Sequence, residues 1–221
     1  MGGSDCEHIG QGLLGQPVNA VSTLAYVIVA VLLLWRVLGV RPRASLTIYA
    51  VIVAGIGFGS VMFHGPMPSW GRFAHDLTIA AVLAFVIAFD ASLVRAATVR
   101  MTLVIFAALV GVSAVVLVVS PDASNAVVAV FVGGAAGAEL VVIRLASSRT
   151  TAPTPVWILG AAVLIVGAVL NGLGRTDAPF CDPDSVVQFH ALWHVLTAFV
   201  LWLYGTAVLG ARAQARPKIH A

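Results

Sequence analysis

The sequence predicts an all-α membrane protein, a bundle of seven transmembrane helices with its N-terminus outside and its C-terminus in the cytoplasm. Hydrophobic residues make up 60% of the 221 residues and charged residues only 10%, and the mean hydropathy is +1.03. This composition is too apolar for a soluble domain. A membrane-spanning helix needs about 20 mostly apolar residues. Seven segments meet that requirement: 18–37, 46–64, 76–94, 101–120, 125–145, 155–173 and 188–209.

The basic residues predict the orientation of these segments, because cytoplasmic loops are enriched in Lys and Arg. If the seven segments alternate in direction, only Arg72 and Arg175 lie on one side. The other side then carries Arg36, Arg41, Arg43, Arg95, Arg100, Arg144, Arg149, Arg212, Arg216 and Lys218. Merging the fourth and fifth segments across the polar turn at 120–125 would break this alternation. We therefore expect an extracytoplasmic segment 1–17, one transmembrane domain 18–209 and a basic cytoplasmic tail 210–221.

The N-terminal segment is polar and lacks the basic stretch and the A-x-A cleavage site of a signal peptide. The sequence has no basic run with interleaved aromatic residues, which excludes nucleic-acid binding. Cys6 and Cys181 are its two cysteines, and both fall on the outer, oxidising side. We expect a disulfide between them.

Polar side chains gather at the outer ends of three predicted helices. Residues four apart share one face of a helix. An ionisable residue inside an apolar segment is costly to bury, so each one is a candidate functional residue. The orientation rests on Arg and Lys alone, yet it brings these polar groups to one depth. The second segment contributes Ser60 and His64, the third contributes Asp76, and the seventh contributes His190 and His194.

Three histidines with an open fourth position are the ligand set of a catalytic zinc site, where zinc lowers the pKa of water to about 7. Asp76 would act as a general base or orient the water, and Ser60 would hydrogen-bond an oxyanion. Each of these residues also has a purely structural explanation when it is taken alone. His64 could be a solvated residue at a helix end, and Asp76 could be the N-cap of its helix. Ser60 could hydrogen-bond to the backbone of its own helix. Their common depth favours the metal site.

Several further polar residues have no assigned role in the sequence. His75 is expected in the loop before the third helix. Asp90 and Glu139 lie inside apolar segments. We expect Asp90 either to reach the cytoplasm or to pair with a nearby arginine. We expect Glu139 either to pair with an arginine or to mark a polar interior of the bundle. Asn19 and Asn171 are expected to hydrogen-bond between helices.

The polar residues also form motifs that resemble those of the alkaline ceramidase family, which belongs to a group of seven-helix membrane hydrolases that includes the adiponectin-type receptors. The matching strings are Gly59-Ser60-x-x-x-His64, then Asp76, then His190-Ala-x-Trp193-His194-x-Leu-Thr197. In that family the Ser, Asp and three His positions build a zinc site. The site hydrolyses the amide of ceramide to sphingosine and a fatty acid.

The resemblance implies zinc bound by His64, His190 and His194, with Ser60 and Asp76 contacting the water or the substrate carbonyl. It implies a hydrolase whose ceramide-like lipid amide enters from the bilayer and is cleaved to a long-chain amine base and a fatty acid. The short loops and Ala/Val-rich segments look bacterial, so we expect a multi-pass plasma-membrane protein with its site on the extracytoplasmic side. The chain length of the lipid and the oligomeric state stay open.

The calcium site of the family matches only in part. Cys6-Glu7 resembles the Cys-Glu pair of the family's N-terminal segment, and Cys6 with Cys181 resembles its disulfide. Asp5 adds a carboxylate, but Gln16 stands near the place where a further carboxylate is expected. A requirement for calcium is therefore left open.

Three other functions are consistent with parts of the sequence. A lipid-sensing receptor on the same scaffold would hold a structural zinc ion and show little or no hydrolysis. A haem protein would use histidines from two helices, which a pair four residues apart on one helix suits poorly. A transporter would use Glu139 and Asp90 as a proton path, but the polar groups gather at one end instead of crossing the bilayer.

Overall fold

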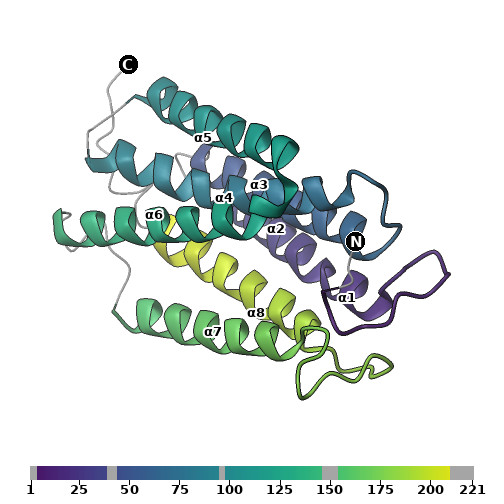
Figure 1. The fold of residues 1–221 in the computed structure, drawn as a ribbon. Helices are drawn as coiled ribbons and strands as arrows, with labels where there is room; N and C mark the ends of the chain where they lie inside the picture. The colour runs from purple at the N-terminus through teal and green to yellow at the C-terminus, as the bar shows by residue number, and fades with distance from the viewer. Residues whose placement is uncertain (1–3, 39–43, 95–97, 146–153, 210–221) are drawn as a thin grey trace.

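The computed structural model describes residues 4–38, 44–94, 98–145 and 154–209 (Figure 1). Seven helical spans in these ranges are long and apolar enough to cross a membrane, which confirms the predicted class. Within the described residues there is no β-strand, and one isolated bridge joins Asp5 and Arg175. The tail 210–221 and four of the counted arginines, at positions 41, 43, 95 and 149, lie outside the described residues.

The spans follow the predicted segments closely. The first comprises two helices around Thr23, and a short 3-10 helix (Pro121–Ala123) separates α5 from α6, as the polar turn predicted. The helices are α1 (Pro17–Ser22), α2 (Leu24–Val37), α3 (Ala44–His64), α4 (Gly71–Val94), α5 (Val99–Val119), α6 (Ser124–Leu145), α7 (Thr154–Leu173) and α8 (Phe189–Leu203), which continues as a π-helical stretch (Tyr204–Leu209).

One boundary was predicted wrongly. Helix α4 begins at Gly71, five residues before the expected start, so His75 lies in the helix and not in a loop. The first turn is closed by hydrogen bonds from Gly71 N to Pro68 O (2.7 Å) and from Ala74 N to Trp70 O (3.0 Å). Hydropathy marks only the apolar part of a span, so it misses a polar first turn.

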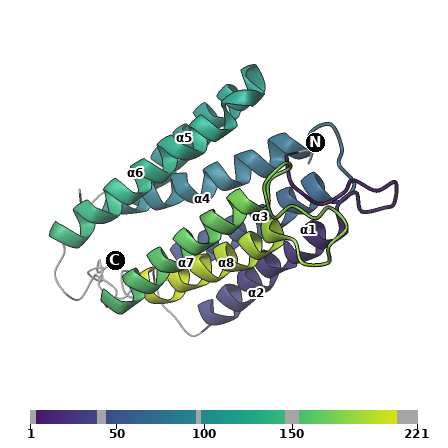
Figure 2. The same cartoon turned by 60° about the horizontal axis from the view of Figure 1, so that its bottom comes forward.

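The core lies among α2, α3 and α4 and is closed by α8. Leu33 and Tyr49 are fully buried there, and the Tyr49 hydroxyl donates to Leu201 O at 3.0 Å. Helices α3 and α4 approach closely at Gly59, where a Cβ atom would lie 2.7 Å from Ala74 O. Helices α5 and α6 lie on the α4 side of this core, and α7 lies beside α8 (Figures 1 and 2).

Asp90 and Glu139 are both buried inside the bundle, Asp90 completely. Of the two alternatives expected for Asp90, reaching the aqueous surface is therefore wrong, whereas pairing with Arg95 involves a residue outside the described ranges. The position of Asp90 in α4 directs its side chain into the helix packing, whereas reaching the aqueous surface would require an outward-facing position near the helix end.

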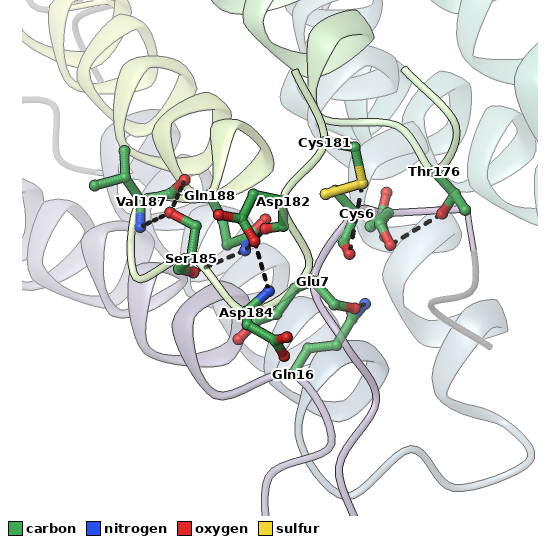
Figure 3. Close-up of a disulfide and its surroundings, with 11 residues drawn as sticks. Cys6, Glu7, Gln16, Thr176, Cys181, Asp182, Asp184, Ser185, Val187 and Gln188 are labelled. Atoms are coloured by element: carbon green, nitrogen blue, oxygen red, sulfur yellow. Dashed lines mark hydrogen bonds between the residues drawn. A yellow bond between two sulfur atoms is a disulfide. The ribbon is translucent and has the colours of Figure 1, made fainter. Parts of the chain in front are cut away.

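One end of the bundle carries the N-terminal segment, the α3–α4 connection and the α7–α8 loop (Figure 1), and we call it the disulfide end. The disulfide between Cys6 and Cys181 is present, as predicted. Backbone hydrogen bonds join the same two segments, from Cys6 N to Gly174 O (2.9 Å) and from Thr176 N to Ser4 O (3.0 Å). Figure 3 shows Glu7 and Gln16 close to this linkage. The N-terminal segment is therefore tied to the loop that leads into α8.

Candidate metal centre

Three buried histidines meet at the disulfide end. His64 is the last residue of α3, and His190 and His194 lie in the first two turns of α8. One nitrogen from each ring lies within 4.8 Å of the other two, and the Nε2 atoms of His190 and His64 are 3.3 Å apart. The structure thus brings together the three residues that the sequence predicted as ligands.

Each ring is held through its Nδ1 atom by one polar neighbour. The pairs are His64 with Gln16 Oε1 (2.7 Å), His194 with Ser22 Oγ (2.8 Å) and His190 with Asn171 Oδ1 (2.8 Å). Amide oxygens accept hydrogen bonds only, so His64 and His190 donate from Nδ1. A ring that donates from Nδ1 presents its Nε2 lone pair to a metal.

The Nε2 atoms have no adequate protein partners. His194 Nε2 is buried and has no hydrogen-bond partner among the described residues. His64 and His190 face each other with two acceptor nitrogens, which repel unless a cation lies between them. Buried polar atoms are nearly always paired, so this arrangement fits a bound metal ion. Three imidazoles with an open position match catalytic zinc, although imidazole also suits copper, iron and nickel.

Close backbone approaches position these rings. The N-terminal segment pairs with the end of α3 through Gly15 N to Gly65 O and Gln16 N to His64 O, both at 2.8 Å. After α7, the chain passes so near the start of α8 that a Cβ atom on Gly174 would lie 2.8 Å from His190 N. Glycine permits this approach, and it lets Asn171 reach His190 from α7.

Ser60 and Asp76 occupy different positions relative to the histidines. Ser60 is buried one turn before His64 on α3. Asp76 lines a small hollow with Leu117 and other residues on the α5 side. One carboxylate oxygen of Asp76 accepts from His75 Nδ1 (2.8 Å), and the other lies 3.7 Å from Arg72 Nε.

His75 connects Asp76 to the cluster. Its ring stacks on Phe63 with centroids 4.8 Å apart and meets the His64 ring edge-on at 6.1 Å. Sequence reasoning missed this residue because it placed the start of α4 too late. The missed signal is that position 75 follows Gly71 by four residues, and Gly71 packs against α3 at Met62 O.

Glu7 and Gln16 serve the protein's own structure. The Glu7 carboxylate accepts from Val18 N (2.7 Å) and Asn19 N (2.8 Å), which caps α1. Gln16 donates from Nε2 to Glu7 O at 2.9 Å while its Oε1 contacts His64. Calcium takes about six to eight oxygen ligands. Among the described residues no group of three or more carboxylates comes together with Glu7, so this region offers few of the oxygen ligands that calcium takes.

Asp5 is buried beside the cluster, near His190. Its Oδ1 atom is 3.5 Å from His190 Nδ1 and 3.8 Å from Arg175 Nη1. Burial raises the pKa of the Asp5 carboxyl to about 6, while the charges of Arg175 and His75 act in the opposite direction. Asp5 thus adds a second acceptor near the His190 Nδ1 atom.

A shallow, open apolar depression lies on the surface of α1. Pro17, Val18, Val21 and Ser22 line it, and Ser22 also contacts His194 Nδ1. The apolar outer face of α1 therefore leads directly to a residue that holds one of the candidate ligands.

One comparison with known proteins gives a match. The family model described as Ceramidase matches residues 12–219, nearly the whole chain, and the match includes all three clustered histidines. No curated protein matches the chain.

Proposed function

The chain belongs to the Ceramidase family, and from this premise we propose a zinc-dependent intramembrane hydrolase. It would cleave the amide bond of a ceramide-like lipid to give a long-chain amine base and a fatty acid. The family supports a ceramidase-like hydrolase. The observation that carries the zinc-dependent reaction is the set of three buried imidazoles, each with a polar partner at Nδ1 and with one nitrogen of each ring within 4.8 Å of the other two.

When bound by His64, His190 and His194, zinc supplies a Lewis acid for the amide carbonyl and a water acidified to a pKa of about 7. The protein contributes the fixed geometry of this centre. Gln16 and Ser22 come from the start of the first span and Asn171 from the end of α7, so ligand orientation depends on several elements packing together.

Proton transfer toward the leaving amine is assigned to Asp76. Its carboxylate is hydrogen-bonded to His75 Nδ1 at 2.8 Å, and the His75 ring packs edge-on against His64. We therefore route the proton between Asp76 and the substrate through the His75 imidazole. Ser60, buried one turn from His64, is assigned the hydrogen bond that stabilises the oxyanion.

Entry of the lipid from the bilayer is supported by the shallow apolar surface that Pro17, Val18 and Val21 form on α1 beside Ser22. The substrate chains would lie along this face of α1 while the polar head meets the histidines. The positive-inside bias of the basic residues supports an extracytoplasmic site, and the short loops and Ala/Val-rich spans favour a bacterial plasma membrane.

The decisive experiment combines metal analysis of the purified protein with mass-spectrometric detection of products from a panel of ceramides, other lipid amides and lipid esters. We expect one zinc ion per chain and release of a fatty acid from the amide. His190→Ala should lose both the zinc and the activity. The exposed His8→Ala variant is the matched control and should keep both.

Two results would contradict the proposal. Full zinc occupancy with unchanged turnover in His190→Ala would remove that histidine from the centre. Stoichiometric zinc without turnover on any lipid in the panel would favour a lipid-sensing receptor with a structural metal.

A further inference from the structure

The side chain of Asn19 is buried and has no hydrogen-bond partner in the part of the chain that the structure describes. It is 0% exposed, and neither its Oδ1 nor its Nδ2 atom has a hydrogen-bond partner among the described residues. A carboxamide buried in this way loses its hydrogen bonds to water and gains none in return. This outcome differs from the sequence expectation that Asn19 bonds to a neighbouring helix.

The neighbours of Asn19 on the same face are paired. Gln16, three residues earlier, contacts His64, and Ser22, three residues later, contacts His194. The hydroxyl of Thr23 donates to Ala20 O at 2.6 Å. The unpaired amide is therefore peculiar to position 19 and not a general property of this face.

The location of Asn19 relates it to the histidines. Residues three apart share a helix face, so Asn19 lies between the two residues that hold His64 and His194. The ring centroids of His64 and His194 are 5.1 Å apart. The backbone of Asn19 is anchored on both sides, because its N–H donates to Glu7 Oε2 and its carbonyl accepts from Ser22 Oγ, both at 2.8 Å.

We propose that Asn19 is a substrate-binding residue whose carboxamide hydrogen-bonds a lipid group that both donates and accepts, next to the bond being cleaved. An amide N–H with its carbonyl, or a hydroxyl adjacent to the amide, meets that description. The inference rests on the proposed function and deepens it. It gives the site a group for recognising the polar head that is separate from Ser60, Asp76 and the metal ligands.

The first test replaces Asn19 by Leu, which branches at Cγ as Asn does, is larger and has no polar atoms. We expect kcat/KM for the ceramide-like substrate to fall about tenfold or more, as for loss of a buried hydrogen bond, with the zinc content unchanged. The melting temperature of the metal-free protein should stay equal or rise, because an unpaired buried group has been removed.

Thr23→Val is the matched control, since it removes a buried hydroxyl from the same face that is already satisfied by the protein. We expect its turnover to stay within about twofold of the wild type, because the hydroxyl bonds only its own helix. If Asn19→Leu fails to fold, Asn19→Ala and Asn19→Ser are measured in the same way.

A comparison of substrates distinguishes the two groups that Asn19 could bind, the amide and the adjacent hydroxyl. The wild type is tested on a lipid amide, on the ester of the same chains and on an amide without the adjacent hydroxyl. The Asn19→Leu variant should lose its preference for whichever feature Asn19 binds. A variant that keeps every preference and the wild-type kcat/KM, but melts at a lower temperature, would show that the amide binds a structural water and would overturn the proposal.

A measurement of ligand affinity tests the role of Asn19 separately from the proposed hydrolysis. A long-chain alkyl hydroxamate carries both N–H and O–H groups and binds metals, so its affinity is measured on the zinc-loaded protein. We expect about tenfold weaker binding to Asn19→Leu. If the wild type cleaves no lipid, the proposed function fails, but the hydroxamate still tests Asn19, and equal affinity for both proteins would refute its role.

Discussion

The helices divide into two groups with different surroundings. Helices α2, α3, α4 and α8 share the buried core, and α3 and α8 carry the three histidines, whereas α5, α6 and α7, which lie outside this core (Figure 2), bury few of their side chains. The most apolar span is α5, which buries only Ser113 and Leu117 in the described structure. The least apolar span contains α8, which supplies two candidate ligands. Between these two spans, the more apolar one is therefore the one that buries less of its surface in the bundle.

Helix α7 shows where the division fails. Among its described residues it buries only Gly167, which packs on Trp193 of α8, yet its end provides Asn171 for His190. A helix can therefore contribute little packing and still determine the orientation of a ligand.

The largest effect is expected for His194→Ala. Removing one of three ligands leaves an incomplete centre, so zinc and amide hydrolysis should both fall below detection. The matched change, Ser113→Ala, removes a buried polar group from α5 and should keep both. Metal analysis and product detection on the two variants check this contrast, and a zinc-replete His194→Ala protein would contradict it.

The next effect concerns the path through His75. His75→Asn keeps a donor for Asp76 but removes the second ring nitrogen, and turnover should fall by about 10²- to 10⁴-fold with zinc retained. Asp76→Asn alone should lower turnover as well, but add nothing in the His75→Asn background, because both residues act in one path. Multiplying losses in the double variant would show that Asp76 acts directly.

A smaller effect is expected for Asn171→Ala. Loss of the Nδ1 contact should weaken zinc affinity about 10- to 100-fold without unfolding the bundle, since α7 packs little of the core. Asn125→Ala, at an exposed position of α6, is the matched control with unchanged affinity. Competition with a zinc chelator measures both, and equal affinities would mean that Asn171 does not orient His190.

No effect is expected from calcium. Glu7 caps α1 and Gln16 is engaged with His64, so adding calcium to zinc-loaded protein should change turnover by less than about twofold. Titration of calcium into protein freed of it by a chelator and then reloaded with zinc tests this. A saturable activation would reveal a calcium site outside these contacts.

Several features could be predicted because they depend on local sequence. The seven spans follow from the length of apolar runs, and the facing of His190 and His194 follows from their four-residue spacing on a helix. The Cys6–Cys181 disulfide followed from a topology derived from charge alone. The start of α4 could not be predicted as well, because its first turn is polar and leaves no hydropathy signal.

The sequence by itself determined the class, the spans and the three candidate ligands. Only the tertiary structure decided which side chains meet them: Gln16, Ser22 and Asn171 at the Nδ1 atoms, His75 between Asp76 and His64, and Asn19 unpaired on the same face. The physical reason lies in the membrane. A helix with lipid on one side and protein on the other is apolar on both, so its pattern does not encode its rotation, and packing alone determines which residues face the site.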